Sequence, residues 1–431
     1  MIESFFWRKL VVKTGMARLI PSLVQSIPRE LDHLELYSDR TLSLPYSELH
    51  DSALLPDIST PGSINFALGN PRCDLHSSMP RIVTDCRPDF WGDSALRQEL
   101  AERFHVDHGQ AVDSDQEFLI TPGGASTFAS TLDALINPGD RVVLFDPTSP
   151  IFPLGLKHRR ARIHWVPTWS DEGRMRFPMD VFSKAIRGAK MVVLGDPVNP
   201  TGCLMTPEDL EQIAFWAQKV EAIIYLDSSF DRWREERPRV RLAQLPNGTG
   251  RVITAGSFAK SHGLTSARVG WVSGPKHLLN PIAGASLLNG NSVAPVCQQM
   301  ALTALRIGDP ALQSIRDDLN ARRHYVFERL LGMGLKPTTA KGGFFLWVPV
   351  PTQETSHAFA QRLLGETGVL VNPGHVFGPS GKNFFRLSFA IDEGRLREGL
   401  ARLEAFLNPP PVAKLLEEPI PETISMENVT R

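Results

Sequence analysis

Between about residue 117 and residue 260, short and almost continuously apolar runs alternate with stretches of helical spacing. Runs such as Val142-Val143-Leu144 and Ala222-Ile223-Ile224 are typical of strands that are buried on both faces of a sheet. Because strands alternate with helices, the pattern predicts an α/β fold with a mainly parallel, doubly wound sheet and helices on both faces. The predicted strands are 117–121, 141–146, 190–196, 221–227 and 251–257.

Helices are predicted where apolar residues recur every three or four positions. Leu96, Leu100 and Phe104 indicate a helix over 94–104, with Ser94 as its cap. Further helices are predicted over 126–136 and, opened by Thr206, over 207–220. After about residue 310 the pattern becomes a long helix over 310–333, strands at 343–349, 369–371 and 384–390, and helices near 355–366 and 393–407.

These changes of pattern predict four segments. Residues 1–63 form an N-terminal arm that packs on the small domain or on a partner subunit, and 64–308 form a large ligand-binding domain. Residues 309–408 form a smaller α+β domain. The stretch 409–431, which begins with three prolines, is predicted to be a flexible tail.

Charge and cysteine usage exclude several classes of protein. A net charge of −1 over 431 residues offers no electrostatic basis for binding nucleic acid. No apolar run reaches the roughly 18 residues of a membrane-spanning helix, and the N-terminus does not resemble a secretory signal. The four cysteines are far apart and form no C-x-x-C pair, which argues against a metal site and favours the cytoplasm.

Residues whose side chains can bind a ligand or take part in a reaction follow the predicted strands. Asp146, Asp196, Asp227 and Lys260 all lie at or just after strand ends, where open parallel sheets bind their ligands. Gly123-Gly124-Ala125 opens a helix, so its backbone N–H groups suit a phosphate. Each feature alone also has an ordinary structural reading as a turn or a cap. Their combination on one sheet favours a ligand site, with Lys260 as a Schiff-base lysine.

At this point the chain resembles the fold type I pyridoxal-phosphate enzymes, and within them the class I/II aminotransferases of the aspartate aminotransferase superfamily. The resemblance extends from about Ile64 to Leu407. It rests on Pro122-Gly-Gly-Ala125, Asn137-Pro-Gly-Asp140, Asp196-Pro-Val-Asn-Pro-Thr-Gly202, Tyr225-Leu-Asp227, Ser257-Phe-Ala-Lys260 with Arg268-Val-Gly270, and Phe384-Phe-Arg-Leu-Ser388.

The resemblance implies pyridoxal 5'-phosphate as cofactor and a role for each motif residue. Lys260 would form the internal aldimine and then move the proton of the 1,3-shift. Asp227 would pair with the pyridinium nitrogen, and Asn199 would donate to the ring's phenolic oxygen. The phosphate would be held by the Gly123-Gly124-Ala125 turn together with Ser257 and Arg268.

The resemblance also implies a substrate site. Arg386 would bind the substrate α-carboxylate with help from Asn199, and Gly69 would line the substrate side. The competing interpretation of Arg386 is a surface arginine on an edge strand. The expected substrates are an amino acid and a 2-oxo acid, and a homodimer with shared active sites is expected.

Three positions depart from the usual family pattern. Phe230 replaces a tyrosine whose phenol donates to the cofactor's ring oxygen, and Ser149 replaces an aromatic that stacks on the cofactor. Phe128 or Phe152 could supply that stacking ring. The stretch shortly before Gly92 contains Arg87, Phe90 and Trp91 but no tyrosine, whereas the family often has one there that reaches the partner's phosphate.

Three functions follow in order of preference. The first is an aminotransferase that works through a pyridoxamine phosphate intermediate. The second keeps the cofactor but catalyses elimination, decarboxylation, cyclisation or oxidation of an amino acid, and Phe230 is the feature that favours it. The third is a non-catalytic sensor domain, which no basic N-terminal segment supports.

Overall fold

The computed structural model describes residues 62–66, 89–109, 111–236, 242–245, 250–290 and 292–408. The predictions for most of the N-terminal arm, for Gly69 and for the tail therefore lie outside the described residues. The predicted domain limits at 63, 308 and 408 stay predictions. Within the described residues, no helix is both long and apolar enough to cross a membrane.

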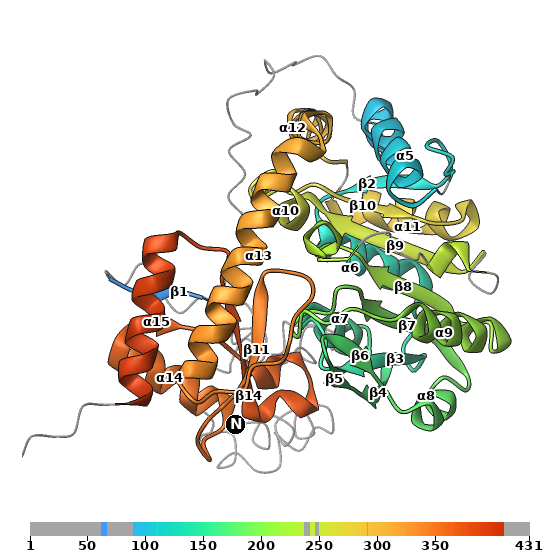
Figure 1. Cartoon of the computed structure of the whole chain (residues 1–431). Coiled ribbons are helices and arrows are strands. Elements are labelled where there is room, and N and C mark those ends of the chain that lie inside the picture. Colours follow the sequence, from blue (N-terminus) through green and yellow to red (C-terminus); the bar gives the residue numbers. More distant parts are fainter. Residues whose placement is uncertain are drawn as a thin grey trace, which may run out of the picture.

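A seven-stranded sheet forms the centre of the larger part of the molecule (Figure 1). All neighbouring strands are parallel except β10, which is antiparallel to both β2 and β9. The mainly parallel sheet is confirmed, whereas β4 and β10 were not predicted. In spatial order the strands are β2 (Phe118–Thr121), β10 (Gly270–Ser273), β9 (Val252–Ser257), β8 (Ile223–Asp227), β7 (Ala189–Gly195), β3 (Arg141–Asp146) and β4 (Arg162–Pro167).

Helices cover both faces of this sheet, as the continuous apolar strands predict. Along β3, Val142 and Leu144 belong to one buried cluster while Val143 and Phe145 belong to another, because successive side chains of a strand point to opposite faces. The first cluster is covered by α6 (Gly124–Leu135), α7 (Ile151–His158) and α11 (Lys276–Gly290); the second by α8 (Met179–Ala185) and α9 (Pro207–Lys219). Helices α5 (Ser94–His108) and α12 (Pro295–Ile307) pack beside β2 and β10.

Two predicted helix caps can be compared directly with the structure. Thr206 caps α9 as predicted, because its hydroxyl accepts a hydrogen bond from Asp209 N at 3.1 Å. The predicted cap Ser94 is wrong. Asp93 caps α5 instead, and its carboxylate accepts from Leu96 N at 2.9 Å.

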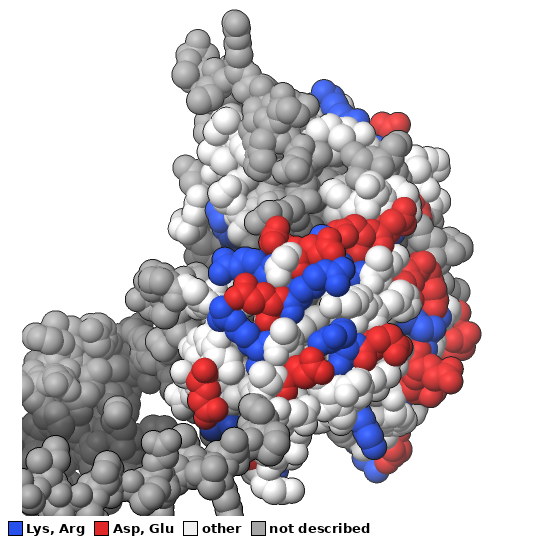
Figure 2. Space-filling model, turned by 60° about the vertical axis from the view of Figure 1, so that its left-hand side comes forward, with Lys and Arg blue, Asp and Glu red and all other residues white. Residues whose placement is uncertain are grey.

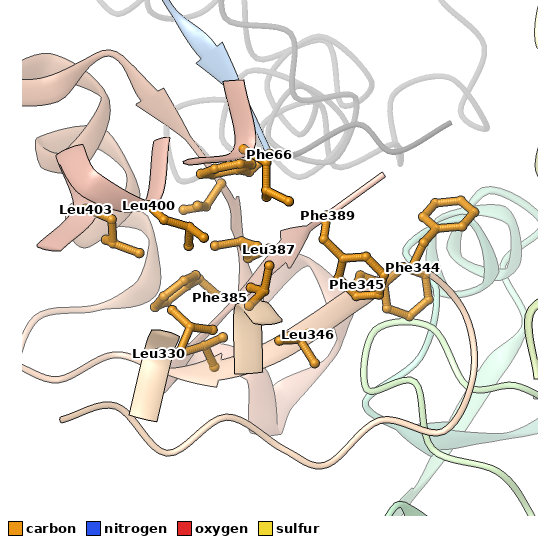
Figure 3. Close-up of a cluster of buried hydrophobic side chains, with 14 of the residues drawn as sticks. Phe66, Leu330, Phe344, Phe345, Leu346, Phe385, Leu387, Phe389, Leu400 and Leu403 are labelled. Atoms are coloured by element: carbon orange, nitrogen blue, oxygen red, sulfur yellow. The ribbon is translucent and has the colours of Figure 1, made fainter. Parts of the chain in front are cut away.

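The C-terminal part builds a second core around a three-stranded antiparallel sheet with β14 in the middle. Figure 3 shows the buried cluster in which Leu330, Leu346, Phe385, Leu400 and Leu403 meet. Its elements are α13 (Asp309–Gly332), β11 (Phe345–Pro349), α14 (Ser356–Thr367), β12 (Val369–Leu370), β13 (Asn372–Pro373), β14 (Phe384–Ser388) and α15 (Glu393–Leu407).

Short elements complete the architecture. Strand β1 (Ile64–Asn65) pairs in parallel with β12, so an N-terminal segment joins the C-terminal core. The others are the hairpin β5 (Trp169–Asp171) and β6 (Arg174–Arg176), the helix α10 (Phe258–Ser261), and the 3-10 turns η5 (Asp231–Trp233), η6 (Leu242–Gln244), η7 (Gly374–Phe377) and η8 (Pro379–Asn383).

Charges of both signs are interleaved on the face shown in Figure 2. Helix α15 carries pairs of this kind, in which Arg397 meets Glu393 and Arg402 meets Glu398 one turn away. Exposed pairs of this type contribute little to stability. They do, however, spread the charge rather than gather it into one basic face.

Candidate active site

Adjacent parallel strands bring the predicted site residues to one edge of the large sheet. Asp227 ends β8, and Ser257 ends the neighbouring β9. Lys260 lies on α10, which follows β9 directly. Asn199 lies in the loop that follows β7, the neighbour of β8 on the other side. The carboxyl ends of parallel strands lie at one edge, so these residues of different loops converge there.

Lys260 is the amine at the centre of this edge. Burial, followed by the positive charges of Arg386 and Arg268, lowers the pKa of Lys260 to about 8, although Asp227 acts in the opposite direction. The backbone of α10 is held in place by Trp233, whose indole N–H donates to Lys260 O at 2.7 Å. A substantial fraction of this amine is therefore neutral, and nucleophilic, near pH 8.

Asp227 supplies the negative charge that faces Lys260. Burial raises the pKa of Asp227, while hydrogen bonds from Ser229 and the charge of Lys260 lower it in part. The backbone N–H of Ser229 donates to the Asp227 carboxylate at 3.0 Å. Ser229, which the sequence did not single out, thus helps to keep a buried carboxylate at this position.

The glycine turn before α6 forms a cradle with Ser257 and Arg268. Gly123 has φ +89°, and a methyl group added there would lie 2.7 Å from Arg268 Nη2. A methyl group on Gly124 would lie 3.4 Å from Ser257 Cβ. The first intrahelical bond of α6 runs from Thr127 N to Gly123 O at 3.0 Å, which leaves the N–H groups of Gly124 and Ala125 at the helix entrance. A cradle of N–H groups, a hydroxyl and a guanidinium fits a phosphate.

Arg386 reaches the same site from the C-terminal sheet. Its Nη1 donates to Asn199 Oδ1 at 2.7 Å, so β14 contacts the loop that follows β7. The prediction of an edge-strand arginine as the alternative is wrong, because β14 is the central strand of its sheet. Burial lowers the pKa of Arg386 to about 10, which leaves the guanidinium charged at neutral pH.

Two of the aspartates at strand ends anchor loops. Asp196 accepts from Met205 N at 3.1 Å and from Arg234 Nη1 at 2.7 Å. Asp146 accepts from the backbone N–H and the hydroxyl of Ser380 at 2.9 and 2.8 Å. These anchors hold the Asn199 loop and the η8 turn, and neither Arg234 nor Ser380 was predicted as a partner.

The aromatic rings of Phe230, Phe128 and Phe152 lie in apolar surroundings. Phe230 is 5% exposed and packs edge-to-face on Phe344 and Phe345, with ring centroids 5.4 and 5.0 Å away. Phe128 and Phe152 are buried against Tyr225 within the core under α6 and α7. Both of the rings suggested for stacking are therefore core residues in this structure.

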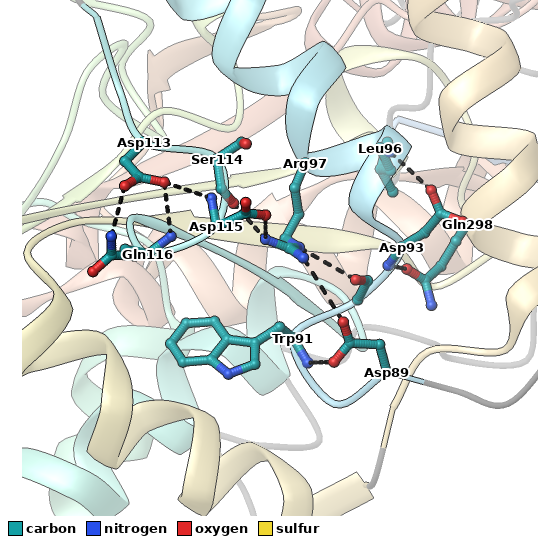
Figure 4. A network of polar contacts seen from close by, with 11 residues as sticks. Asp89, Trp91, Asp93, Leu96, Arg97, Asp113, Ser114, Asp115, Gln116 and Gln298 are labelled. Atoms are coloured by element: carbon teal, nitrogen blue, oxygen red, sulfur yellow. Dashed lines mark hydrogen bonds and ion pairs between the residues drawn. The ribbon is translucent and has the colours of Figure 1, made fainter.

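The segment before α5 contains Phe90 and Trp91. Figure 4 shows how buried Arg97 organises it, donating to Asp115 Oδ1 at 2.9 Å and lying 3.7 Å from the Asp89 carboxylate. Trp91 O accepts from Ile120 N on β2 at 3.0 Å. The segment is thus fixed close to the turn that holds Gly123.

Comparison with known proteins places this arrangement in a family. The profile of "Aminotransferase class I and II" matches residues 87–403. This chain belongs to the class I and II aminotransferases. It is 32% identical to an arginine–pyruvate transaminase of Pseudomonas aeruginosa over 317 residues, which cover 73% of this chain and 80% of that protein.

Further relatives agree with this assignment. An LL-diaminopimelate aminotransferase of Maridesulfovibrio salexigens is 26% identical over 81% of this chain and 88% of its own length. The structure superimposes on aspartate aminotransferase from Thermus thermophilus with a TM-score of 0.78 and 25% identity, covering 85% of this chain and 98% of that one. The chain is therefore a pyridoxal-phosphate-dependent transferase that moves amino groups between amino acids and 2-oxo acids.

Proposed function

We propose that Lys260 is the catalytic amine of this aminotransferase. Bound pyridoxal phosphate supplies an aldehyde that bonds to amines and a ring that accepts the electrons of a substrate carbanion. Lys260 Nζ would take the proton from the substrate Cα and deliver it to the carbon that carried the cofactor's aldehyde, which is the 1,3-shift of a transamination. A pKa of about 8 lets this amine act as both base and acid near neutral pH.

Asp227 and Asn199 would hold the two polar ends of the cofactor ring. The Asp227 carboxylate keeps a proton on the ring nitrogen, because its negative charge favours the protonated form. Asn199 uses its carbonyl oxygen for Arg386. Its amide nitrogen therefore remains as the donor to the ring oxygen.

The cradle of Gly123, Gly124, Ala125, Ser257 and Arg268 would bind the cofactor phosphate, and Phe230 would lie beside the ring. On the other side Arg386 would bind the substrate α-carboxylate with its two-pronged guanidinium. Support for this comes from the link of Arg386 to Asn199, which joins the substrate side to the cofactor side.

The observation that carries the proposal is the convergence on Lys260 of Asp227 from β8, Arg386 from β14 and Arg268 from the segment before β10. The test is borohydride reduction of the loaded enzyme followed by intact mass and peptide mapping. In the wild-type protein we expect the mass of the reduced cofactor on the peptide that contains Lys260. In Lys260→Ala we expect neither this adduct nor the visible absorbance band of the loaded enzyme. Lys184→Ala, a change at an exposed lysine paired with Asp180, is the matched control and retains both. A covalent adduct that persists in Lys260→Ala rejects the assignment.

We also infer a homodimer. Leu288 is 88% exposed at the end of α11 and Phe90 is 48% exposed before α5. Both lie near the end of β2. Trp91, which follows Phe90, accepts at its backbone oxygen from Ile120 N of β2. Gly290, two residues after Leu288, lies beside Pro122, because a methyl group added to it would be 3.4 Å from that proline. Exposed apolar side chains beside a site are typical of an interface. Light scattering should give twice the chain mass, and Leu288→Glu should weaken the dimer; a wild-type monomer rejects it.

Cytoplasmic location is part of the proposal. Cys203 and Cys297, the cysteines within the described residues, are both free thiols. Free thiols are typical of proteins in reducing compartments. Cell fractionation of the native protein tests the location, and recovery in a membrane or extracellular fraction contradicts it.

A further inference from the structure

Arg386 has a second amide partner that the sequence motifs did not indicate. Asn372 lies on β13, directly opposite Arg386 of β14 in the antiparallel register. Side chains of directly opposed residues share one face of a sheet and lie close together. Arg386 Nη2 donates to Asn372 Oδ1 at 2.7 Å, and Asn372 is only 4% exposed.

The guanidinium is therefore held from several directions. Asn199 binds Nη1 and Asn372 binds Nη2, each at 2.7 Å. The rings of Phe345 and Phe377 lie 5.2 and 5.0 Å from the central carbon of the guanidinium. Two amide oxygens fix the orientation of the plane, and the rings favour the cation by their quadrupoles.

We propose that Asn372 is a positioning residue that orients Arg386 for the substrate α-carboxylate without neutralising its charge. This inference rests on the proposed function of Arg386. A carboxylate in the place of Asn372 would accept the same hydrogen bond. It would also add a fixed negative charge at the guanidinium, and that charge would compete with the carboxylate of the substrate.

The reaction favours a neutral amide over a carboxylate as the partner of Arg386. Both the amino acid and the 2-oxo acid carry a carboxylate next to the reacting carbon, so each half-reaction uses the same guanidinium. A correctly oriented Arg386 places that carbon against Lys260 in both directions. Loss of orientation should therefore raise KM for both substrates together.

The variants Asn372→Ala and Asn372→Asp separate orientation from charge. The probe is 2-aminoisobutyrate, which has the α-carboxylate and amine but no Cα hydrogen and so cannot complete the transfer. Its Kd is read from the visible absorbance of the loaded enzyme. We expect Kd, and KM for both substrates, to rise about tenfold in Asn372→Ala, since a hydrogen bond to a charged group is lost. The near-isosteric Asn372→Asp should show the larger rise.

Parallel measurements on Arg386→Met distinguish the possible failures. If Arg386→Met leaves Kd unchanged, the proposed function of Arg386 is wrong. If Arg386→Met raises Kd but both Asn372 variants bind within twofold of wild type, only the present inference is overturned. Equal losses in Asn372→Ala and Asn372→Asp also overturn it, because a purely structural role is insensitive to charge. Asn372→Val, which also lacks an acceptor oxygen and suits a strand, replaces the alanine variant if that one does not fold, and is judged by the same criteria.

Discussion

A methyl group at Gly123 should damage phosphate binding far more than it damages the fold. Gly123 has φ +89°, and its added Cβ would lie 2.7 Å from Arg268 Nη2. Gly139 has nearly the same backbone angle, φ +90°, and no atom lies within 4 Å of an added Cβ. Gly139→Ala is therefore a control that carries the backbone cost alone.

The two costs can be estimated separately. A side chain at a positive-φ position of this kind costs about 1–3 kcal/mol, so both variants should lose stability within that range without cofactor. At Gly123 the clash is with the end of a flexible side chain, which can swing away. Arg268 would then leave the cradle, and loss of a charge-assisted contact costs roughly 1.5–3 kcal/mol of binding free energy. That corresponds to a Kd about 10- to 150-fold higher.

The measurements are urea unfolding of the cofactor-free protein and fluorescence titration with pyridoxal phosphate. Titration with pyridoxal, which lacks the phosphate, serves as an internal control. We expect Gly123→Ala and Gly139→Ala to unfold alike and to bind pyridoxal alike, whereas only Gly123→Ala loses affinity for pyridoxal phosphate. If the two variants bind pyridoxal phosphate equally, Arg268 is not a phosphate ligand.

Two other predictions concern buried charges. The pKa of Lys260 is about 8 in the fold against 10.5 in the unfolded chain, so the unfolded state binds more protons between these values and stability rises with pH there. Lys260→Met should therefore stabilise the cofactor-free protein at pH 7 by up to about 3 kcal/mol. Urea unfolding at a series of pH values should show this gain in stability shrinking between pH 8 and 10.5. A gain that does not depend on pH contradicts the prediction. Asp196→Ala should cost about 3 kcal/mol, because buried Arg234 loses its carboxylate partner at 2.7 Å and keeps the longer ion pair with Asp231 at 3.6 Å. Removing Asp180 from its exposed pair with Lys184 is the control, for which unfolding should change by no more than about 0.5 kcal/mol.

The sequence predicted the parts of the fold that depend on local pattern. The apolar runs of β2, β3, β7, β8 and β9 and the helix over α15 were located correctly, because burial on both faces and helical spacing leave clear periodicities. The cap of α5 was misplaced by one residue, since Asp93 and Ser94 are both good caps and local composition cannot separate them. Asn372 was missed for a different reason. Its value depends on its register opposite Arg386, which is a property of strand pairing and not of the segment itself.

The antiparallel strand β10 explains how Arg268 comes to lie beside the glycine turn at Gly123. A parallel strand ends at the ligand-binding edge, so the residues that follow it lie there. Strand β10 runs the other way, and Gly270 at its start pairs with Thr121 of β2 and with Ser257 of β9. The residues that precede β10, including Arg268, therefore lie at the same edge as the residues that follow β2 and β9. Gly270 also has to be small, because a methyl group there would lie 2.9 Å from Gly124 N. One reversed strand thus places a guanidinium between a glycine turn and a serine that are distant in sequence, which a purely parallel reading of the chain could not anticipate.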